Sequence, residues 1–283
     1  MKRILCIPYA PILGDVRRNS ARIVELAHAI AATEMHPDLV VFPELTLSGY
    51  LLESLVAEAA VSREDLSALA ENLTATGMPA GTEWVVGAPL RDGAQIYNVA
   101  AVLAGGQIRH MQKKIFLPTY GMFDEARYFS RGNNLISYEG ALGKTAILIC
   151  EDAWHMELAY AAAETRAEHV VVISSSPARG YLSGGAAFDS TLTWQNRLRV
   201  FADSYGQNFI YCNRSGVEDG ILFDGSNFVI GGGPRFLPAQ TAAIYEKAAL
   251  YKLGSGFERH AGFGGDSSRQ NDLPLVREIL ANL

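Results

Sequence analysis

Short apolar runs alternate along the chain with longer segments in which apolar residues recur at helical spacing. A short run of mostly apolar residues is typical of a buried strand. Such runs occupy residues 3–7, 38–42, 83–89, 97–103, 108–114, 146–149, 169–173, 208–212, 226–230 and 248–252. Strands separated by helices predict an α/β fold.

Helical patterns occupy several of the segments between these strands. Their predicted positions are residues 19–35, residues 51–77 as one or two helices, a segment after Trp154, and residues 189–205 and 275–283. Asn19 and Ser20 can cap the first of these helices, and Gly206 can end the one at residues 189–205. Because no tandem repeat, low-complexity linker or domain break interrupts the order, we expect a single domain over residues 1–283.

Composition narrows the classes of function. The chain is 49% hydrophobic and carries 24 Lys and Arg against 30 Asp and Glu, a net charge of −6. This balance leaves no basic surface for nucleic acid and no polybasic patch for a membrane, so we expect a small-molecule partner. There is also no run of about 18 apolar residues that would predict a membrane span.

The cysteines and the N-terminus bear on the compartment. Cys6, Cys150 and Cys212 show no paired spacing, which argues against a disulfide framework and a thiolate zinc site. No HExxH or similar spacing predicts a metal site. Pro8 and Pro11 interrupt the apolar start, which therefore fits a first strand better than a signal peptide. We expect a cytoplasmic protein without a metal or cofactor.

Three apolar runs end in polar residues that could carry chemistry. Glu44 follows residues 38–42, Cys150 follows residues 146–149, and Ser174 to Ser176 follow residues 169–173. The carboxyl ends of strands are where α/β sheets gather their ligands. Each residue has a plainer interpretation as well. Glu44 could be an exposed strand-end carboxylate, and Cys150 could be a small buried hydrophobe.

The predicted turn at Cys150 also has a chemical interpretation. A helix that starts at this turn points free backbone N–H groups at the thiol, which favours a thiolate and can hold an oxyanion. The aromatic-rich loop at residues 114–129 is either functional or packed locally on the surface. His155 beside the turn could start a helix or contact substrate.

Glu44, Lys114 and Cys150 would form a coherent catalytic group if the fold brought them together. The thiolate attacks a carbonyl or nitrile carbon, the carboxylate moves the proton to the leaving amine, and the ammonium stabilises the oxyanion. The same carboxylate could then activate the water that releases a thioester. This scheme does not need a histidine.

Three motifs carry a family resemblance over nearly the whole chain. Phe42-Pro43-Glu44, Lys114-x-x-Leu117-Pro118 and Ile149-Cys150-Glu151-Asp152 resemble, in order and spacing, the catalytic motifs of the nitrilase (carbon–nitrogen hydrolase) superfamily. The wider stretches at residues 43–50, 117–129 and 150–154 are similar to the glutamine-amide-hydrolysing domain of glutamine-dependent NAD synthetases.

The resemblance implies a nitrilase-like α-β-β-α sandwich and a homo-oligomer, a dimer or higher, paired near the cysteine helix. It implies a thioester at Cys150, with Glu44 as general base, Lys114 beside the oxyanion, and Glu125 as a second glutamate that holds Lys114. A backbone N–H near Glu151 would complete the oxyanion hole. The expected substrate-binding residues are Tyr120, Glu151, Trp154, Ser176 and Arg179. Arg179 either binds a substrate carboxylate or is an ordinary surface arginine.

One feature departs from the NAD synthetase pattern. Those enzymes carry an ATP-using domain with an SGGxDS-like phosphate loop, and residues 264–268 read Gly-Gly-Asp-Ser-Ser. No predicted strand precedes this stretch and few residues follow it, so we expect a flexible loop there.

The sequence therefore predicts an amidase that releases ammonia from a small substrate, with glutamine-like amides first. The alternatives are hydrolysis of an N-carbamoyl compound or a nitrile, a glutaminase subunit that supplies ammonia to a separate synthetase, or a binding protein that has lost turnover.

Overall fold

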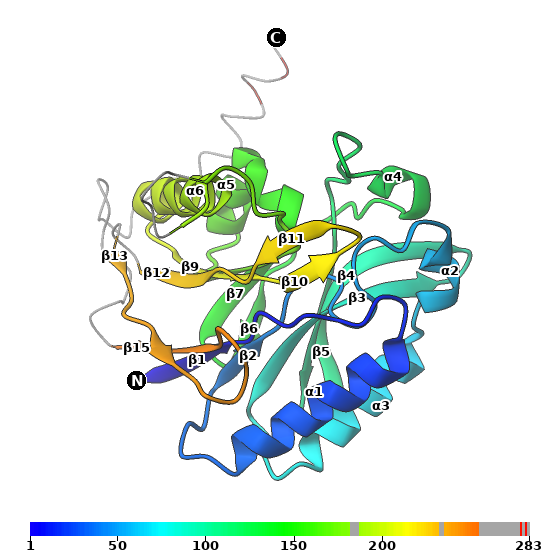
Figure 1. The fold of residues 1–283 in the computed structure, drawn as a ribbon. Coiled ribbons are helices and arrows are strands. Elements are labelled where there is room, and N and C mark those ends of the chain that lie inside the picture. The colour runs from blue at the N-terminus through cyan, green and yellow to red at the C-terminus, as the bar shows by residue number, and fades with distance from the viewer. Residues whose placement is uncertain (182–186, 232–234, 255–277, 279–280, 282–283) are drawn as a thin grey trace.

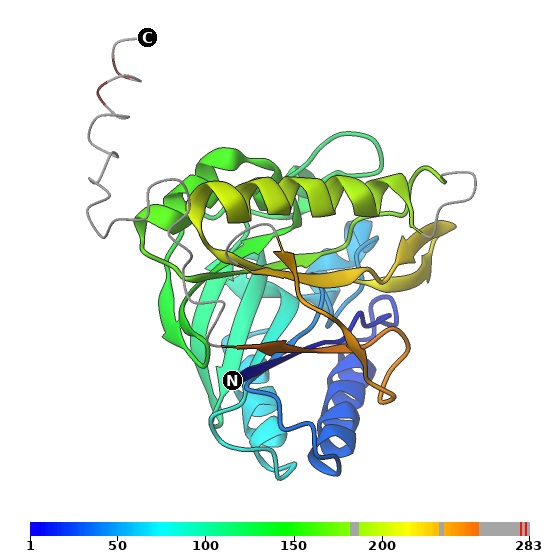
Figure 2. The same cartoon turned by 90° about the vertical axis from the view of Figure 1, so that its left-hand side faces the viewer.

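Two stacked β-sheets with helices on both outer faces form the protein. The computed structural model describes residues 1–181, 187–231, 235–254, 278 and 281. Helices α1 (Val16–Ala31) and α3 (Arg63–Thr74) cover one sheet, and α5 (Met156–Glu164) and α6 (Asp189–Tyr205) cover the other (Figures 1 and 2). This arrangement confirms the predicted α-β-β-α sandwich.

The first sheet joins the two ends of the described chain. Its strand order is β14-β15-β1-β2-β3-β4-β5. The strands are β1 (Lys2–Cys6), β2 (Leu39–Val41), β3 (Glu83–Asp92), β4 (Gln95–Ala104), β5 (Gln107–Lys113), β14 (Gln240–Thr241) and β15 (Ala249–Leu253). The central β1, β2 and β3 run parallel, whereas β4, β5 and β15 pair in antiparallel fashion.

The second sheet has the order β13-β12-β9-β8-β7-β6. Its strands are β6 (Tyr138–Gly140), β7 (Gly143–Ile149), β8 (His169–Ser174), β9 (Asn208–Asn213), β12 (Asn227–Gly231) and β13 (Arg235–Phe236). Here β7, β8 and β9 run parallel. A separate hairpin of β10 (Ser215–Glu218) and β11 (Ile221–Asp224) follows β9. Short helices α2 (Val56–Ala59) and α4 (Glu125–Tyr128) lie in the connections.

The core of the described residues lies mainly in three layers, one between the sheets and one under each pair of helices, and a smaller fourth cluster includes Leu45, Tyr50 and Phe129. The inter-sheet layer is made of fully buried side chains from both sheets, among them Ile4, Cys6, Val41, Val85, Ile147, Val171, Ile210 and Cys212. The helix α1 packs Ile23 and Ala27 on the first sheet, and α6 packs Trp194 and Leu198 on the second. Burial of these apolar faces supplies the main driving force for stacking the layers.

The first helix starts earlier than the pattern predicts. Its N-cap is Asp15, whose side chain accepts a hydrogen bond from the backbone N–H of Arg18, and the helix ends at Ala31. Asn19 lies within the helix and is fully buried, and its amide nitrogen donates to the carbonyl groups of Ile12 and Leu47. Asn19, which the sequence pattern predicts as a cap, therefore links α1 to other segments of the chain, because its hydrogen-bond partners lie in those segments.

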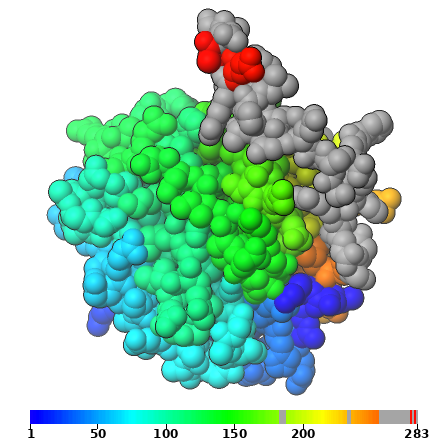
Figure 3. Space-filling view, turned by 180° about the vertical axis from the view of Figure 1, so that it is seen from behind, coloured from blue at the N-terminus to red at the C-terminus, as the bar shows by residue number. Residues whose placement is uncertain are grey.

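Several short strands escape the sequence pattern. They are β6, β10, β13 and β14, which have too few apolar residues for a run, and β11, whose Ile-Leu-Phe run the prediction overlooked. The expected helix at residues 275–283 and the loop at residues 264–268 fall almost wholly outside the described residues. Within the described part, no helix has the length and apolar character needed to cross a membrane. Figure 3 shows the opposite side of the molecule, which residues from the middle of the chain largely cover.

Candidate active site

Three residues predicted to be catalytic meet at the ends of strands from both sheets. Glu44 follows β2, Lys114 follows β5 and Cys150 follows β7. The Nζ atom of Lys114 lies 2.6 Å from Glu44 Oε1 and 2.6 Å from Glu125 Oε1. All of these side chains are buried, so water does little to screen the attraction between the charges. The fold thus places the lysine between two carboxylates.

The carboxylate of Glu44 is held on both oxygens. Its Oε1 accepts hydrogen bonds from Lys114 and from Asn98 Nδ2 at 2.8 Å, and its Oε2 accepts one from the backbone N–H of Ser175 at 2.9 Å. Asn98 lies in β4 and Ser175 follows β8, so both sheets orient this carboxylate. A general base works best when its partners fix its direction in this way.

Glu125 is the second carboxylate, at the start of α4. Its Oε1 accepts hydrogen bonds from Lys114 Nζ and from the hydroxyl of Tyr50 at 2.5 Å. Its Oε2 is buried and has no hydrogen-bond partner among the described residues. Burial raises the pKa of Glu125, Lys114 opposes that rise, and Glu44 adds to it. The free oxygen is therefore an unused acceptor inside the site.

Lys114 is charged in this setting. Burial alone would lower the pKa of Lys114, but the carboxylates of Glu125 and Glu44 outweigh burial and hold the pKa well above its ordinary value. The ammonium can thus serve as a fixed positive charge rather than as a proton donor that titrates near neutrality.

Cys150 begins a 3₁₀ helix, η2 (Cys150–Trp154), directly after β7. Its backbone φ is +47°, in the left-handed region that non-glycine residues rarely adopt. Its Sγ accepts a hydrogen bond from Ser174 Oγ at 3.3 Å, and 7% of the residue is exposed. The thiol thus stands at a sharp turn between strand and helix, as predicted.

The surroundings of Cys150 oppose the thiolate that this turn was expected to favour. Burial raises the pKa of Cys150 well above its usual value, and the charge of Glu44 raises it further. Lys114 and Ser174 act in the opposite direction but are weaker. The expectation was wrong because it counted the helix N–H groups and left out the enclosure of the thiol and the carboxylate beside it. The neutral thiol needs a base.

Asp152 is a fully buried carboxylate in the same turn. Its Oδ1 accepts hydrogen bonds from the backbone N–H groups of Ile115 at 3.0 Å and Phe116 at 2.8 Å. Its Oδ2 accepts one from Ile149 at 3.2 Å. Burial raises the pKa of Asp152 to about 7, although these backbone donors and Lys114 lower it.

Three of the expected substrate-binding residues, Tyr120, Glu151 and Arg179, come together at the loop around Gly121. The hydroxyl of Tyr120 donates to Glu151 Oε2 at 2.7 Å. Arg179 reaches the same loop, because a Cβ added at Gly121 would lie 3.7 Å from its Nη2. Ser176 is held close to the strand ends, where its Oγ accepts from Trp194 Nε1 at 2.9 Å.

Trp154 is engaged elsewhere. The guanidinium of Arg197 lies 4.0 Å from the centre of its ring, and the ring of Trp194 meets it edge-on at 5.4 Å. His155 stacks on Phe116, with 3.5 Å between the ring centres, and its Nε2 lies 3.6 Å from Glu151 Oε1. His155 stands at the start of α5, and its contact with Glu151 also supports the hydrogen bond between Tyr120 and Glu151.

Sequence reasoning missed Tyr50 and Asn98, which contact the catalytic group, and Asp152, which contacts the backbone beside Lys114 and Cys150. It placed Ser174 and Ser175 at a strand end that could carry chemistry but gave neither a role. Asn98 gave one signal, since it is a polar residue inside the run 97–103 that forms a buried strand. The others stood in quoted motifs or next to Ser176 without an assigned role, because their partners lie far away in the sequence.

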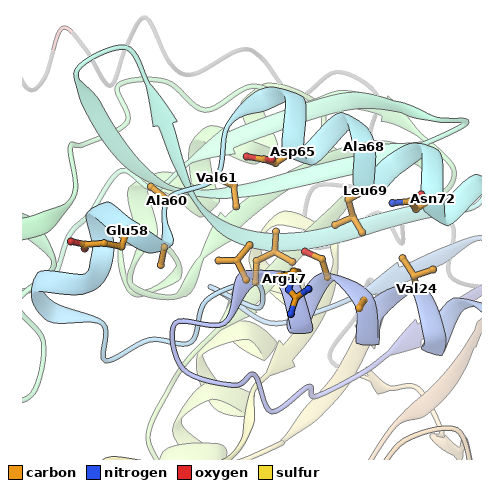
Figure 4. A pocket seen from close by; sticks show the side chains of 14 residues that line it. Arg17, Val24, Glu58, Ala60, Val61, Asp65, Ala68, Leu69 and Asn72 are labelled. Carbon is orange, nitrogen blue, oxygen red and sulfur yellow. The ribbon is translucent and has the colours of Figure 1, made fainter.

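A groove of about 540 Å³ lies on the other side of the first sheet, between α1 and α3 (Figure 4). Its walls are mainly alanine, valine and leucine, with Arg17, Glu58 and Asp65 at intervals. None of the catalytic residues lines it, so the chemistry is assigned to the strand ends. In the described part of the chain, no cluster of His, Cys, Asp and Glu could hold a metal ion.

Comparison with known proteins identifies the family. The sequence profile described as "Carbon-nitrogen hydrolase" matches residues 7–226. The chain belongs to the carbon–nitrogen hydrolase family. The glutamine-dependent NAD(+) synthetase of Xanthomonas campestris pv. campestris is 35% identical over 237 residues, which cover 82% of this chain and 40% of that protein. The family supports a hydrolytic enzyme.

Solved structures of this carbon–nitrogen hydrolase's relatives agree in fold. The glutamine-dependent NAD+ synthetase of Acinetobacter baumannii, in complex with ADP, superposes with a TM-score of 0.72 at 27% identity, covering 88% of this chain and 45% of that one. An amidase from Nesterenkonia sp. gives a TM-score of 0.75 at 22% identity, with 98% and 96% covered. The chain thus spans less than half the length of these synthetases and nearly all of the amidase.

Proposed function

We propose that this carbon–nitrogen hydrolase cleaves the C–N bond of a small amide and releases ammonia through a thioester on Cys150. The observation that carries the proposal is the buried group in which Lys114 contacts both Glu44 and Glu125 beside the thiol. Buried charges are costly, and such a group in one place is typical of an active site.

Glu44 supplies the base that the neutral thiol requires. It takes the proton from Cys150 as the sulfur attacks the amide carbon, and Lys114 stabilises the oxygen that becomes negative. A backbone N–H near Glu151 completes the oxyanion hole. As the tetrahedral intermediate collapses, Glu44 gives the proton to the departing nitrogen, which leaves as ammonia.

The second half of the reaction reuses the same groups. Glu44 takes a proton from a water molecule, the hydroxide attacks the thioester carbon, and the sulfur leaves and regains a proton. The products are a carboxylic acid, ammonia and the free thiol, so the atoms balance. The free Oε2 of Glu125 can accept a hydrogen bond from the substrate amide and hold it in line with the sulfur.

The charges of Arg179 and Glu151 near the loop at Gly121 support a substrate that carries both a carboxylate and an ammonium group. Arg179 can pair with a carboxylate, whereas Glu151, held by Tyr120, can accept from an ammonium group. These charges support glutamine-like amides over aliphatic amides, N-carbamoyl compounds and nitriles. Ser176 would add a polar contact to the substrate. Trp154, whose ring contacts the guanidinium of Arg197, would line one side of the substrate site.

The test is ammonia release from glutamine, asparagine, short aliphatic amides, N-carbamoyl amino acids and nitriles. Cys150→Ala should abolish release at unchanged thermal stability, and Glu44→Gln should stop acylation or trap an adduct visible by mass spectrometry. Release that persists in Cys150→Ala would overturn the mechanism. Arg179→Ala should raise the KM only for substrates with a carboxylate, and an unchanged KM would remove that role.

A second candidate is an ammonia-supplying unit for a synthetase. It is favoured by the similarity to glutamine-dependent NAD synthetases, of which the chain spans about 40%. In that case glutamine turnover should rise when a separately expressed NAD synthetase domain is added. Turnover that is equally fast without it would favour the independent amidase.

We also infer a cytoplasmic homo-oligomer that pairs through α5 and α6. Met156 in α5 is 65% exposed and Val200 in α6 is 60% exposed, so each helix offers an exposed apolar side chain for such a contact. Light scattering on the purified protein tests it. A monomer at micromolar concentration, or a dimer unaffected by Val200→Glu, would count against this face.

A further inference from the structure

The carboxylate of Asp152 connects the two strands that deliver the lysine and the cysteine. Two of its three hydrogen bonds come from Ile115 and Phe116, directly after Lys114. The third comes from Ile149, directly before Cys150. Because β5 and β7 belong to different sheets, the carboxylate ties one sheet to the other at the active site.

We propose that Asp152 is a positioning residue, which sets the placement of Cys150 relative to Lys114 by clamping the backbone beside each of them. The proposal rests on the proposed function of Cys150 and Lys114, and it adds a residue that touches neither substrate nor sulfur. Misplacement of reacting groups by about 1 Å costs about 100-fold in rate, so a clamp of this kind acts on catalysis directly.

The conformation of Cys150 shows why such a clamp is needed. A cysteine with φ of +47° does not hold that conformation through local preference, and the surrounding contacts must fix it. The bond from Ile149 N–H to Asp152 closes the turn around Cys150 from the preceding residue to the one two positions after it. The strained turn therefore depends on this side chain.

The ionised carboxylate is the best acceptor for all three donors. An asparagine has the same shape, but it offers one acceptor oxygen and an NH₂ group, and that group would face the N–H of Ile149. Protonation of Asp152 weakens the same contact, because the protonated oxygen is a poorer acceptor. The pKa of about 7, raised by burial and lowered by the backbone donors and by the charge of Lys114, places this change within reach of experiment.

The test compares the wild-type protein with Asp152→Asn, and with Asp203→Asn as a matched control on the exposed side of α6. The first readout is the rate at which iodoacetamide alkylates Cys150, followed by mass spectrometry. The second is kcat and KM for the best amide. Asp152→Asn should lower the alkylation rate at least tenfold and kcat about 100-fold at pH 8, with KM changed little.

The pH profile separates positioning from mere folding. As the pH falls from 8 to 5, Asp152 of the wild-type protein becomes protonated. The ratio of wild-type to Asp152→Asn alkylation rates should therefore fall toward one. A ratio that does not depend on pH would overturn the proposal. Alkylation of Asp152→Asn at the same rate as Asp203→Asn, measured well below the melting temperature, would also overturn it.

Two further outcomes stay decisive. If Asp152→Asn does not fold, hydrogen exchange on the wild-type protein replaces it. At pH 8 the amides of Ile115, Phe116 and Ile149 should then be protected from exchange, and exchange as fast as in an unfolded chain would contradict the clamp. If no amide is hydrolysed by the wild-type protein, the proposed function fails, whereas the alkylation ratio still tests Asp152.

Discussion

Lys114 is the residue on which the electrostatics of the site depend. Its side chain is fully buried between Glu44 and Glu125, and both carboxylates lie within hydrogen-bond distance of one ammonium. The pairing offsets the desolvation of three charged groups, and removing the ammonium would leave two carboxylates buried together. The same charge is the proposed stabiliser of the oxyanion. Stability and catalysis therefore share this side chain.

The Lys114→Met variant should accordingly lose both stability and catalytic activity. We expect kcat to fall at least 100-fold and the free energy of unfolding to fall by about 3–5 kcal/mol, measured by urea denaturation. The matched control is Lys113→Met, because Lys113 pairs with Asp92 at the surface and should change either quantity little. Equal losses in both variants would show that the burial of Lys114 has no special energetic role.

At the scale of elements, the β10–β11 hairpin supports the site from outside. Glu218 in β10 forms a buried ion pair with Arg214 at 2.8 Å, and its Oε1 accepts hydrogen bonds from the backbone N–H groups of Tyr50 and Leu51. Tyr50 in turn donates its hydroxyl to Glu125. Through Glu218 the hairpin thus holds the segment that orients the second glutamate.

Gly49→Ala tests how tightly this hairpin closes on the segment. Gly49 has φ of +79°, and a Cβ there would lie 2.7 Å from Glu218 Oε2. We expect a loss of about 2–3 kcal/mol in the free energy of unfolding. Gly77→Ala is the control, because its φ is +87° but no atom lies within 4 Å of the added Cβ, so only about 1 kcal/mol of backbone strain applies. Identical denaturation midpoints would contradict the close contact.

His169 makes the pairing of β8 with β9 sensitive to acid. Its side chain is buried, Asn208 Nδ2 lies 3.2 Å from its Nδ1, and burial lowers its pKa to about 4. Between pH 6.5 and about 4 the unfolded chain binds a proton at this residue and the folded chain does not. The free energy of unfolding should therefore decrease as the pH falls through this range.

His169→Gln should remove that dependence. The difference between the unfolding free energies of wild type and variant should shrink by about 1–3 kcal/mol from pH 7 to pH 4, measured by denaturation at each pH. Asp152 acts with the opposite sign between about pH 4 and 7, because its pKa is raised in the fold. Because wild type and His169→Gln both carry Asp152, the difference between their unfolding free energies cancels that contribution. A difference that stays constant with pH would contradict the role given to His169.

At the scale of the whole molecule, an apolar layer packs the two sheets together, and polar groups at the strand ends join them at the active site. Cys6 from β1 and Cys212 from β9 belong to that layer, and both are fully buried. The catalytic group lies where the layer ends, so Glu44, Lys114 and Cys150 come from strands of both sheets. Correct stacking of the sheets is therefore a condition for the chemistry.

Cys6→Ala and Cys212→Ala should behave as packing variants. Each should cost about 1–3 kcal/mol of unfolding free energy and leave the turnover of the folded enzyme nearly unchanged. Iodoacetamide should label the native protein at Cys150 and spare the two core thiols. Loss of turnover in either variant at low temperature, with the fold intact, would mean that these thiols reach the site.

The sequence by itself determined the strands other than β6, β10, β11, β13 and β14, the main helices, and the placement of Glu44, Lys114 and Cys150 after strands, because apolar periodicity and ordered motifs are local in the chain. The tertiary structure alone decided which groups surround them. Asn98 meets Glu44 across 54 positions, Ser175 meets it across 131, and Glu218 reaches Tyr50 across 168. Such contacts form only when separate sheets stack, and the same stacking encloses Cys150 and raises its pKa where the isolated turn predicts a thiolate.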